Sequence, residues 1–149
     1  DVPVCLSAVP QRMRGIGDIL DRVWPVPQCA IVLVNPAVGV PTGPVFQGLA
    51  RKDNPPMGAC DGFGDLAELV AWLANQRNDL QAPACAVAPA IADVLETLED
   101  ALLARMSGSG STCFGIYPDQ LAADRAAQRI GQAHPDWWVV STTTVGQAP

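Results

Sequence analysis

The stretch Arg105-Met106-Ser107-Gly108-Ser109-Gly110-Ser111-Thr112-Cys113-Phe114-Gly115-Ile116-Tyr117 contains alternating serine and glycine with almost no side-chain bulk. A helix-forming run from Ala90 to Leu103 leads into it, and a β-type run from Thr112 to Tyr117 leads out of it. Glycine permits positive φ and lets another group approach the backbone closely. Main-chain N–H groups in such a loop can bind a polar or anionic ligand. The segment Ser107–Thr112 is therefore a candidate ligand-binding loop.

The same loop also suits an ordinary turn, because most Gly/Ser-rich turns bind nothing. No Gly-Lys-Ser/Thr follows it, so it is not a Walker phosphate loop. It precedes a strand and does not open a helix, so it is not a dinucleotide-binding fingerprint. Spacing alone leaves ligand contact and a plain turn both open.

Short β-type runs are spread along the chain, and helical patterns occupy the intervals between them. The first two runs predict a β-hairpin around Pro10, and the apolar, β-branched third run predicts a buried strand. This order favours an α+β fold with helices on one face of an antiparallel sheet. The strands are predicted at residues 2–6, 11–16, 30–34, 112–117 and 137–144.

Apolar residues at helical spacing predict helices over 65–76, 90–103 and 120–132. Another helix is predicted to start within 41–46, with Thr42 as its N-cap and Pro44 in its first turn. The polar, Pro-rich residues 47–58 predict an exposed loop. The apolar stripe of the 90–103 helix comprises Ile91, Val94, Leu95, Leu98 and Leu102.

Composition limits the classes of function. The chain has 149 residues, of which 49% are hydrophobic, so one folded domain with a genuine core is expected. The net charge is −6 and the nine Lys and Arg form no basic cluster, which argues against nucleic acid and anionic membranes as partners. Five widely spaced cysteines and one histidine predict reduced thiols in a cytoplasmic protein, with no metal site. Because Asp1 runs straight into a predicted strand, we expect a piece of a larger protein.

Three separated motifs resemble one family, the GHMP kinases, and within it the 4-diphosphocytidyl-2-C-methyl-D-erythritol kinases of non-mevalonate isoprenoid biosynthesis. The glycine-rich loop alone would indicate only the GHMP kinases, and the second motif makes the resemblance specific. The motifs are Asp1–Leu6 with Arg14–Asp18, Val32–Pro36 with Val38–Thr42 and Val45–Phe46, and Met106–Phe114, supported by Asn78–Leu80.

The resemblance implies a ferredoxin-like antiparallel sheet with helices packed on it. Residues 1–27 would be a remnant, including a hairpin, of the N-terminal kinase domain, and residues 28–149 the C-terminal domain. The family phosphorylates the 2-hydroxyl of its small-molecule substrate with ATP and Mg²⁺. Its ATP phosphate loop lies in the N-terminal domain and is absent here, so the isolated chain is expected to be inactive.

The resemblance also assigns roles to single residues, each with a simpler alternative. Asp1 matches the catalytic aspartate, a carboxylate that can accept the hydroxyl proton; the alternative is an exposed terminal residue. Phe46 matches the aromatic that stacks on cytosine; the alternative is a core residue. Thr42 matches a substrate-contacting hydroxyl as well as a helix cap. A tight segment beside the substrate, or else a hairpin bend, is formed by Gly15, Ile16 and Gly17.

Two other functions stay open. One is a different GHMP small-molecule kinase, of the homoserine or mevalonate type, against which the block Asn35–Phe46 argues. The other is a ferredoxin-like small-molecule-binding module without chemistry. A phosphate loop encoded upstream of Asp1 would decide for a kinase.

Overall fold

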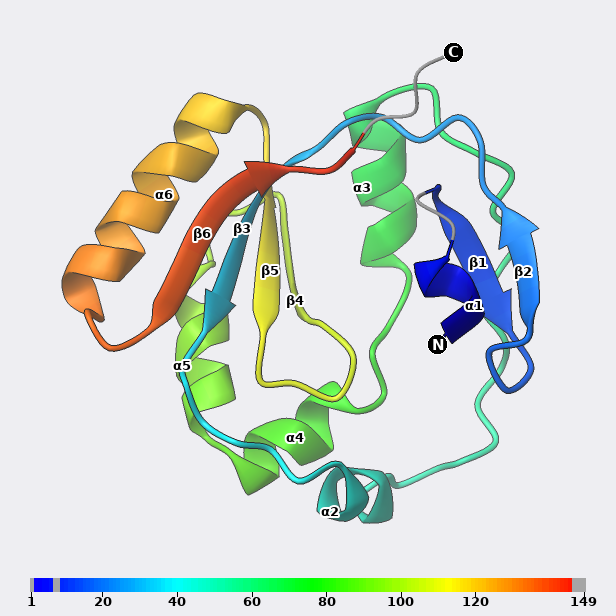
Figure 1. Cartoon of the computed structure of the whole chain (residues 1–149), viewed down its shortest axis with the longest axis horizontal. Helices are drawn as coiled ribbons and strands as arrows, with labels where there is room; N and C mark the ends of the chain where they lie inside the picture. The colour runs from blue at the N-terminus through cyan, green and yellow to red at the C-terminus, as the bar shows by residue number, and fades with distance from the viewer. Residues whose placement is uncertain (1, 7–8, 146–149) are drawn as a thin grey trace.

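The structure is a computed structural model, and it describes residues 2–6 and 9–145. A four-stranded antiparallel sheet lies at its centre, in the order β4-β5-β3-β6 (Figure 1). The third strand along the chain, β3, pairs on both sides, since Val32 lies opposite Gly115 on one neighbour and Ser141 on the other. The strands are β3 (Ala30–Asn35), β4 (Leu103–Met106), β5 (Cys113–Tyr117) and β6 (Trp138–Thr143).

Two helices connect these strands in a β-α-β-β-α-β arrangement, which is the ferredoxin-like topology. Helix α5 (Ala90–Thr97) lies between β3 and β4 in the sequence, and α6 (Gln120–Ala133) lies between β5 and β6. Asp119 caps α6, because its Oδ1 accepts a hydrogen bond of 2.7 Å from the N–H of Ala122. The predicted α+β class with an antiparallel sheet is confirmed.

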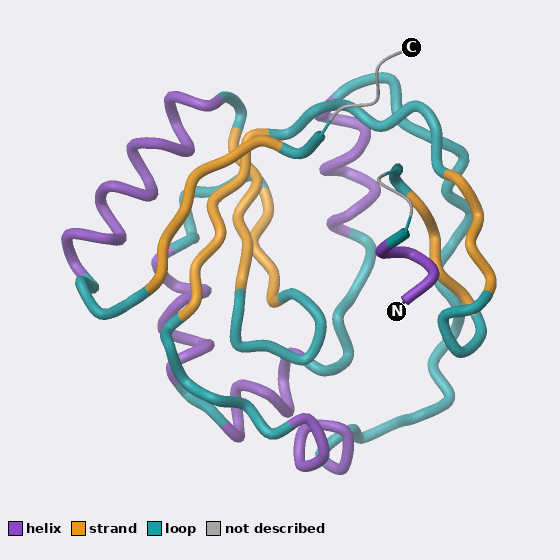
Figure 2. Tube along the Cα trace, viewed as in Figure 1, coloured by secondary structure: helices purple, strands orange, loops and turns teal. Residues whose placement is uncertain are grey.

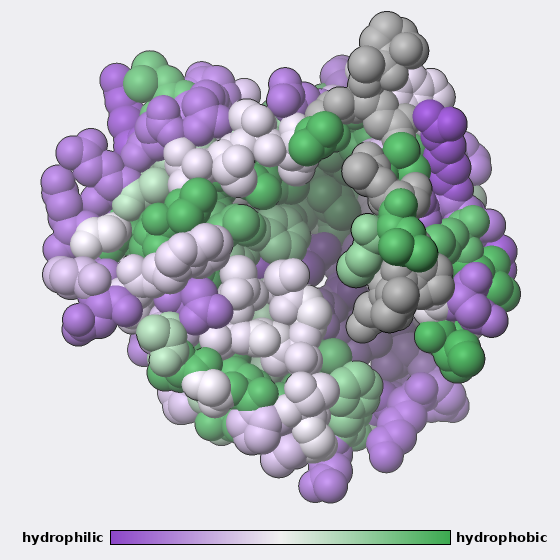
Figure 3. Space-filling view, in the orientation of Figure 1, coloured by the Kyte–Doolittle hydropathy of each residue, from purple (hydrophilic) through white to green (hydrophobic). Residues whose placement is uncertain are grey.

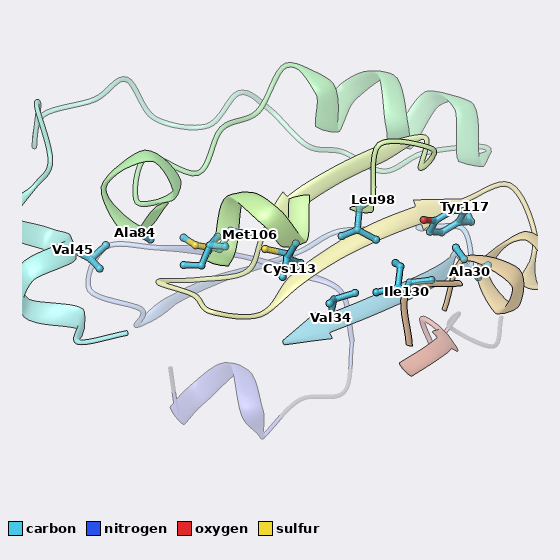
Figure 4. Packing of buried hydrophobic residues seen from close by; sticks show 14 residues of the cluster. Ala30, Val34, Val45, Ala84, Leu98, Met106, Cys113, Tyr117 and Ile130 are labelled. Atoms are coloured by element: carbon cyan, nitrogen blue, oxygen red, sulfur yellow. The ribbon is translucent and has the colours of Figure 1, made fainter. Parts of the chain in front are cut away.

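The main core lies between one sheet face and helices α5 and α6 (Figure 4). Alternate residues of β3 point into it, because successive strand side chains face opposite ways. The Tyr117 hydroxyl, at the edge of this core, donates to Asp100 over 2.9 Å. The fully buried members include Val32, Val34, Ile91, Val94, Leu98, Cys113 and Ala123.

The opposite sheet face carries a second, smaller core against α3 (Leu66–Ala74). Asp65 caps this helix by accepting from the N–H of Glu68 over 2.9 Å. Leu69 then packs with Leu103 and Ile116 of the sheet. The helices therefore cover both faces, and not one face as the order of elements predicted.

Two short helices close one end of the main core. Val45 of α2 (Thr42–Gln47) and Ala84 of α4 (Gln81–Val87) are both fully buried in it. Between α2 and α3 the chain makes a wide arc away from the sheet without forming a helix or strand (Figure 2). This arc contains the exposed loop predicted over 47–58. No helix in the described part of the chain is long and apolar enough to cross a membrane.

The N-terminal segment differs from the prediction. Val2–Cys5 forms the short helix α1 and is not a strand, and the hairpin consists of β1 (Gln11–Arg14) and β2 (Ile19–Arg22). The reason is the turn at Gly15 and Gly17, whose φ angles of 67° and 92° allow the chain to reverse there. The hairpin predicted around Pro10 is therefore wrong.

The helix predicted over 90–103 is also too long. Helix α5 ends at Thr97, and β4 begins at Leu103, paired with Ile116 of β5. The helical spacing of the apolar residues does not decide the structure here, because hydrogen bonds across the sheet form instead. The N–H of Leu102 donates to the carbonyl of Ile116 over 2.8 Å. The Ser107–Thr112 loop thus joins two antiparallel strands.

Candidate functional site

A pocket of about 780 Å³ lies among the described residues, a volume within the usual range for small-molecule sites. Two stretches distant in sequence form most of its walls: residues 46–57, which run from the end of α2 into the arc, and residues 76–80 between α3 and α4. Gly108 of the serine–glycine loop completes the lining. The pocket therefore joins parts of two motifs that the sequence singled out separately.

Phe46 is the aromatic residue of this pocket. Its neighbour Val45 is fully buried, whereas Phe46 itself is 49% exposed. Adjacent helix residues project about 100° apart, so the helix can bury one and present the other. The alternative of a core phenylalanine is therefore wrong, and the exposed ring is available to a ligand.

The serine–glycine loop has two sides with different tasks. Ser111 is buried, and its hydroxyl donates to the carbonyl of Val38 over 2.8 Å, while the Thr112 hydroxyl accepts from Asn35 Nδ2 over 2.9 Å. These two side chains tie the loop to the end of β3. Gly108, on the other side, lines the pocket.

The N–H groups of the loop are partly engaged within it. The N–H of Ser107 donates to the carbonyl of Thr112 over 2.9 Å, and that of Gly110 to the carbonyl of Ser107 over 3.0 Å. The loop is thus a tight hairpin turn as well as a pocket wall. Ser109 is half-buried beside this turn.

Asn78 fixes the loop against the pocket. Its Nδ2 donates to the carbonyl of Met106 over 2.9 Å and to that of Gly108 over 2.8 Å. Its Oδ1 accepts from the N–H of Leu80 over 3.0 Å. One amide side chain therefore connects the segment before α4 with the start of the loop. The sequence motif Asn78–Leu80 supported the family resemblance but gave no sign of this role.

A polar clamp holds the arc at the opposite wall. Arg77 pairs with Asp79 over 2.7 Å and donates through Nη2 to the carbonyl of Pro55 over 2.8 Å. Asn54 Nδ2 donates to the other carboxylate oxygen of Asp79 over 2.9 Å. The residues 77–79 thus bind the arc on one side and the serine–glycine loop on the other.

The other predicted site residues lie elsewhere. Gly15, Ile16 and Gly17 form the turn of the β1–β2 hairpin and are not among the pocket residues; Ile16 is 94% exposed. Thr42 is the first residue of α2, one turn before Phe46. The predicted N-cap role of Thr42 is wrong, because Pro41 takes the extended cap position and no side-chain hydrogen bond caps the helix. Asp1 lies outside the described residues.

A second cavity of about 300 Å³ lies between the sheet and α3. Its walls include Ile31, Leu69 and Phe114, and none of its residues is charged. Figure 3 shows apolar surface bordering a hollow between the sheet and the N-terminal hairpin. The lining of this cavity is almost entirely apolar, so the larger pocket is the better candidate site for a polar ligand.

Comparisons with known proteins agree with this architecture. The family described as "GHMP kinases C terminal" matches residues 57–136. The match includes more than half of the chain, and the chain belongs to this family.

The curated relatives have more specific names than the family model. The chain is 51% identical to a 4-diphosphocytidyl-2-C-methyl-D-erythritol kinase of Dinoroseobacter shibae over 95% of its length, and 53% identical to that of Ruegeria pomeroyi over 93%. It spans about half the length of these curated relatives, 51% in both cases.

Solved structures show the same fold. A crystal structure of 4-(cytidine 5'-diphospho)-2C-methyl-D-erythritol kinase superposes with a TM-score of 0.72 at 28% identity, over 98% of this chain and 54% of that one. A homoserine kinase from Cytophaga hutchinsonii superposes with a TM-score of 0.66 at 20% identity, over 98% of this chain and 51% of that one, which shows a shared fold only.

Proposed function

We propose that the chain is the C-terminal part of a 4-diphosphocytidyl-2-C-methyl-D-erythritol kinase, which transfers the γ-phosphoryl group of ATP to a hydroxyl of that substrate. The observation that carries the proposal is the identity of about half of all residues with relatives of this name, over nearly the whole chain. In this proposal residues 1–27 belong to the N-terminal kinase domain and residues 28–149 form the C-terminal domain. In this proposal the enzyme is cytoplasmic and acts in non-mevalonate isoprenoid biosynthesis.

The pocket supplies part of an acceptor site. Phe46 offers an exposed ring face to the cytosine, and stacking of a base on an aromatic ring contributes roughly 1–3 kcal/mol. Thr42 lies one helical turn earlier, where its exposed hydroxyl shares the same side of α2. We assign Gly15, Ile16 and Gly17 to a backbone segment beside the substrate, contributed by the hairpin.

Asp1 acts in this proposal as the general base. Its carboxylate accepts the proton of the attacking hydroxyl as the oxygen approaches the γ-phosphorus. Phosphoryl-transfer transition states are often loose, so positioning of the hydroxyl contributes to catalysis in addition to proton removal.

ATP and Mg²⁺ are assigned to the whole enzyme. No three His, Cys, Asp or Glu side chains gather into a metal site within residues 2–6 and 9–145. The described part of the chain does not by itself fit Mg²⁺. The serine–glycine loop contributes a backbone wall near Gly108 and not a complete phosphate loop.

A phosphoryl-transfer assay tests the proposal. The protein encoded by the complete reading frame is incubated with ATP and, separately, with the diphosphocytidyl acceptor, homoserine and mevalonate, while ADP release is measured. We expect turnover with the first acceptor only, and background release from the 149-residue chain alone. Turnover with homoserine or mevalonate would support another GHMP kinase, and none with any acceptor would favour the binding module.

A further inference from the structure

The candidate pocket has a charge opposite to that of the molecule. The chain carries nine Lys and Arg against fifteen Asp and Glu, a net charge of −6. The pocket residues include three cations, Arg51, Lys52 and Arg77, and one anion, Asp79, a formal charge of +2. A third of all cations thus gathers at one cavity. Such local enrichment attracts an anionic ligand against the field of the whole protein.

The three cations differ in what already neutralises them. Arg77 is held by Asp79 at 2.7 Å and by the carbonyl of Pro55, so it serves the clamp. Arg51 approaches Asp53 only to 3.8 Å, and both side chains are largely exposed. Such a pair contributes little, because water screens it. Lys52 forms no ion pair among the described residues.

The clamp places these two cations at the pocket. Arg51 and Lys52 precede Asn54 and Pro55, which the Arg77–Asp79 pair anchors. The backbone of the arc is therefore fixed two to four residues away, while both cationic side chains remain free to turn toward a ligand. Phe46, whose ring is 49% exposed, lines the same cavity.

We propose that Arg51 and Lys52 form an anion subsite that binds the diphosphate of a nucleotide in this pocket. This inference rests on the proposed function only for the base, cytosine, which would lie against Phe46. The diphosphate could equally come from the acceptor or from the donor nucleotide, because both present the same two phosphates. Guanidinium and ammonium groups donate charge-assisted hydrogen bonds to phosphate oxygens, which are stronger than neutral ones.

The experiment measures nucleotide binding by calorimetry on the protein from the complete reading frame. Cytidine, CDP and ADP are compared for the unaltered protein and for Arg51→Gln, Lys52→Gln and the double variant. Arg125→Gln, an exposed cation on α6 that does not line the pocket, is the matched control. Because Arg51 and Lys52 are exposed, these changes leave the fold intact, which circular dichroism verifies.

We expect CDP to bind at least about tenfold more tightly than cytidine, with each single variant losing several-fold and the double variant losing the preference. The preference for CDP over cytidine should shrink at 0.5 M salt. The Debye length is then only about 4 Å, so exposed charges are largely screened. ADP binding that depends equally on Lys52 would support the subsite and assign it to the donor.

Equal binding of CDP and cytidine, full preference in the double variant, or no nucleotide binding at millimolar concentration would overturn the inference. The kinase assay distinguishes a failure of the subsite from a failure of the proposed function. Turnover with an acceptor KM unchanged by the double variant would reject the subsite and retain the kinase. A Lys52-dependent CDP preference without turnover would retain the subsite and reject the kinase.

Discussion

At the scale of single residues, exposure and burial decide which side chains can meet a ligand or solvent. Phe46 and Val45 are neighbours on α2, yet one ring is half exposed and the other side chain is fully buried. Cys113 is fully buried at the start of β5, and desolvation raises the pKa of its thiol to about 12. Exposure therefore makes Phe46 available to a ligand, whereas burial withdraws the Cys113 thiol from reaction with solvent.

Replacing Phe46 with Leu in the whole enzyme should weaken acceptor binding by about 1–3 kcal/mol, because the stacking surface is lost. The affinity for ATP should change little. Calorimetry with the acceptor measures the effect, and Leu121→Ala, an exposed apolar residue on α6 outside the pocket, is the control. Unchanged acceptor binding would remove Phe46 from the site.

The Cys113 thiol makes stability depend on pH in the alkaline range. Its pKa is raised in the folded chain from the ordinary 9.0 to about 12, so the folded state keeps a proton that the unfolded state loses. The free energy of unfolding should fall as pH rises from about 9 towards 12, by at most about 1.4 kcal/mol per pH unit for this group.

Urea denaturation at pH 7.5 and pH 10 measures this slope. Tyr117, whose pKa is raised mainly by burial and also by Asp100, adds to it in the same direction. Cys113→Ala should lower stability at neutral pH and reduce the slope, whereas Cys5→Ala, at an exposed position, should leave both unchanged. An identical slope in Cys113→Ala would contradict the assignment.

At the scale of elements, the loop between β4 and β5 connects several parts of the fold. It is fixed to β3 through Ser111 and Thr112 and to the segment before α4 through Asn78. Gly110 occupies a φ of 89°, and a Cβ there would lie 2.9 Å from the Met106 sulfur and 3.2 Å from Ile91. The small side chains of this loop are therefore required by packing in addition to any ligand contact.

Gly110→Ala should lower the free energy of unfolding by roughly 1–2 kcal/mol, because the side chain is strained at positive φ and collides with the core. Gly131→Ala is the matched control. It lies within α6 with nothing within 4 Å of its Cβ position, so it should stabilise by roughly 0.4–1 kcal/mol. Chemical denaturation compares the two, and an unaffected Gly110→Ala protein would contradict this packing.

Asn78→Asp tests the connection between the loop and the pocket. The Asp keeps the acceptor for Leu80 but removes both N–H donors and faces the Met106 and Gly108 carbonyls. We expect a loss of roughly 1–3 kcal/mol in the free energy of unfolding. Faster amide hydrogen exchange at Ser107–Thr112 should accompany it. Asn75→Asp, which alters a single exposed bond to Ala71, should have a smaller effect.

At the scale of the whole molecule, the proposed function makes this chain one part of an acceptor site and assigns turnover to the complete protein. It spans about half of its curated relatives, and its described residues hold no cluster of metal ligands. The half-exposed Phe46 lines the pocket between the arc, α2 and the serine–glycine loop.

Asp1→Asn in the whole enzyme should lower kcat by roughly 10²–10⁴-fold, the range for loss of a general base. The dissociation constant of the acceptor should change little, because the lost interaction belongs to the transition state. Pre-steady-state kinetics separates chemistry from binding. A near-normal kcat would leave positioning and phosphate electrostatics as the source of catalysis.

The sequence by itself determined the fold class, the buried strand at β3, the helix at α6, and the family. These follow from local patterns, since β-branched runs, capping residues and motifs act over a few residues. The tertiary structure decided where α5 ends and where the N-terminal hairpin turns, because a strand exists only where a partner strand accepts its hydrogen bonds. It alone brought Asn78 to the serine–glycine loop and the Arg77–Asp79 pair to the arc, since these contacts join residues 22 to 30 positions apart in the chain and leave no periodic signal.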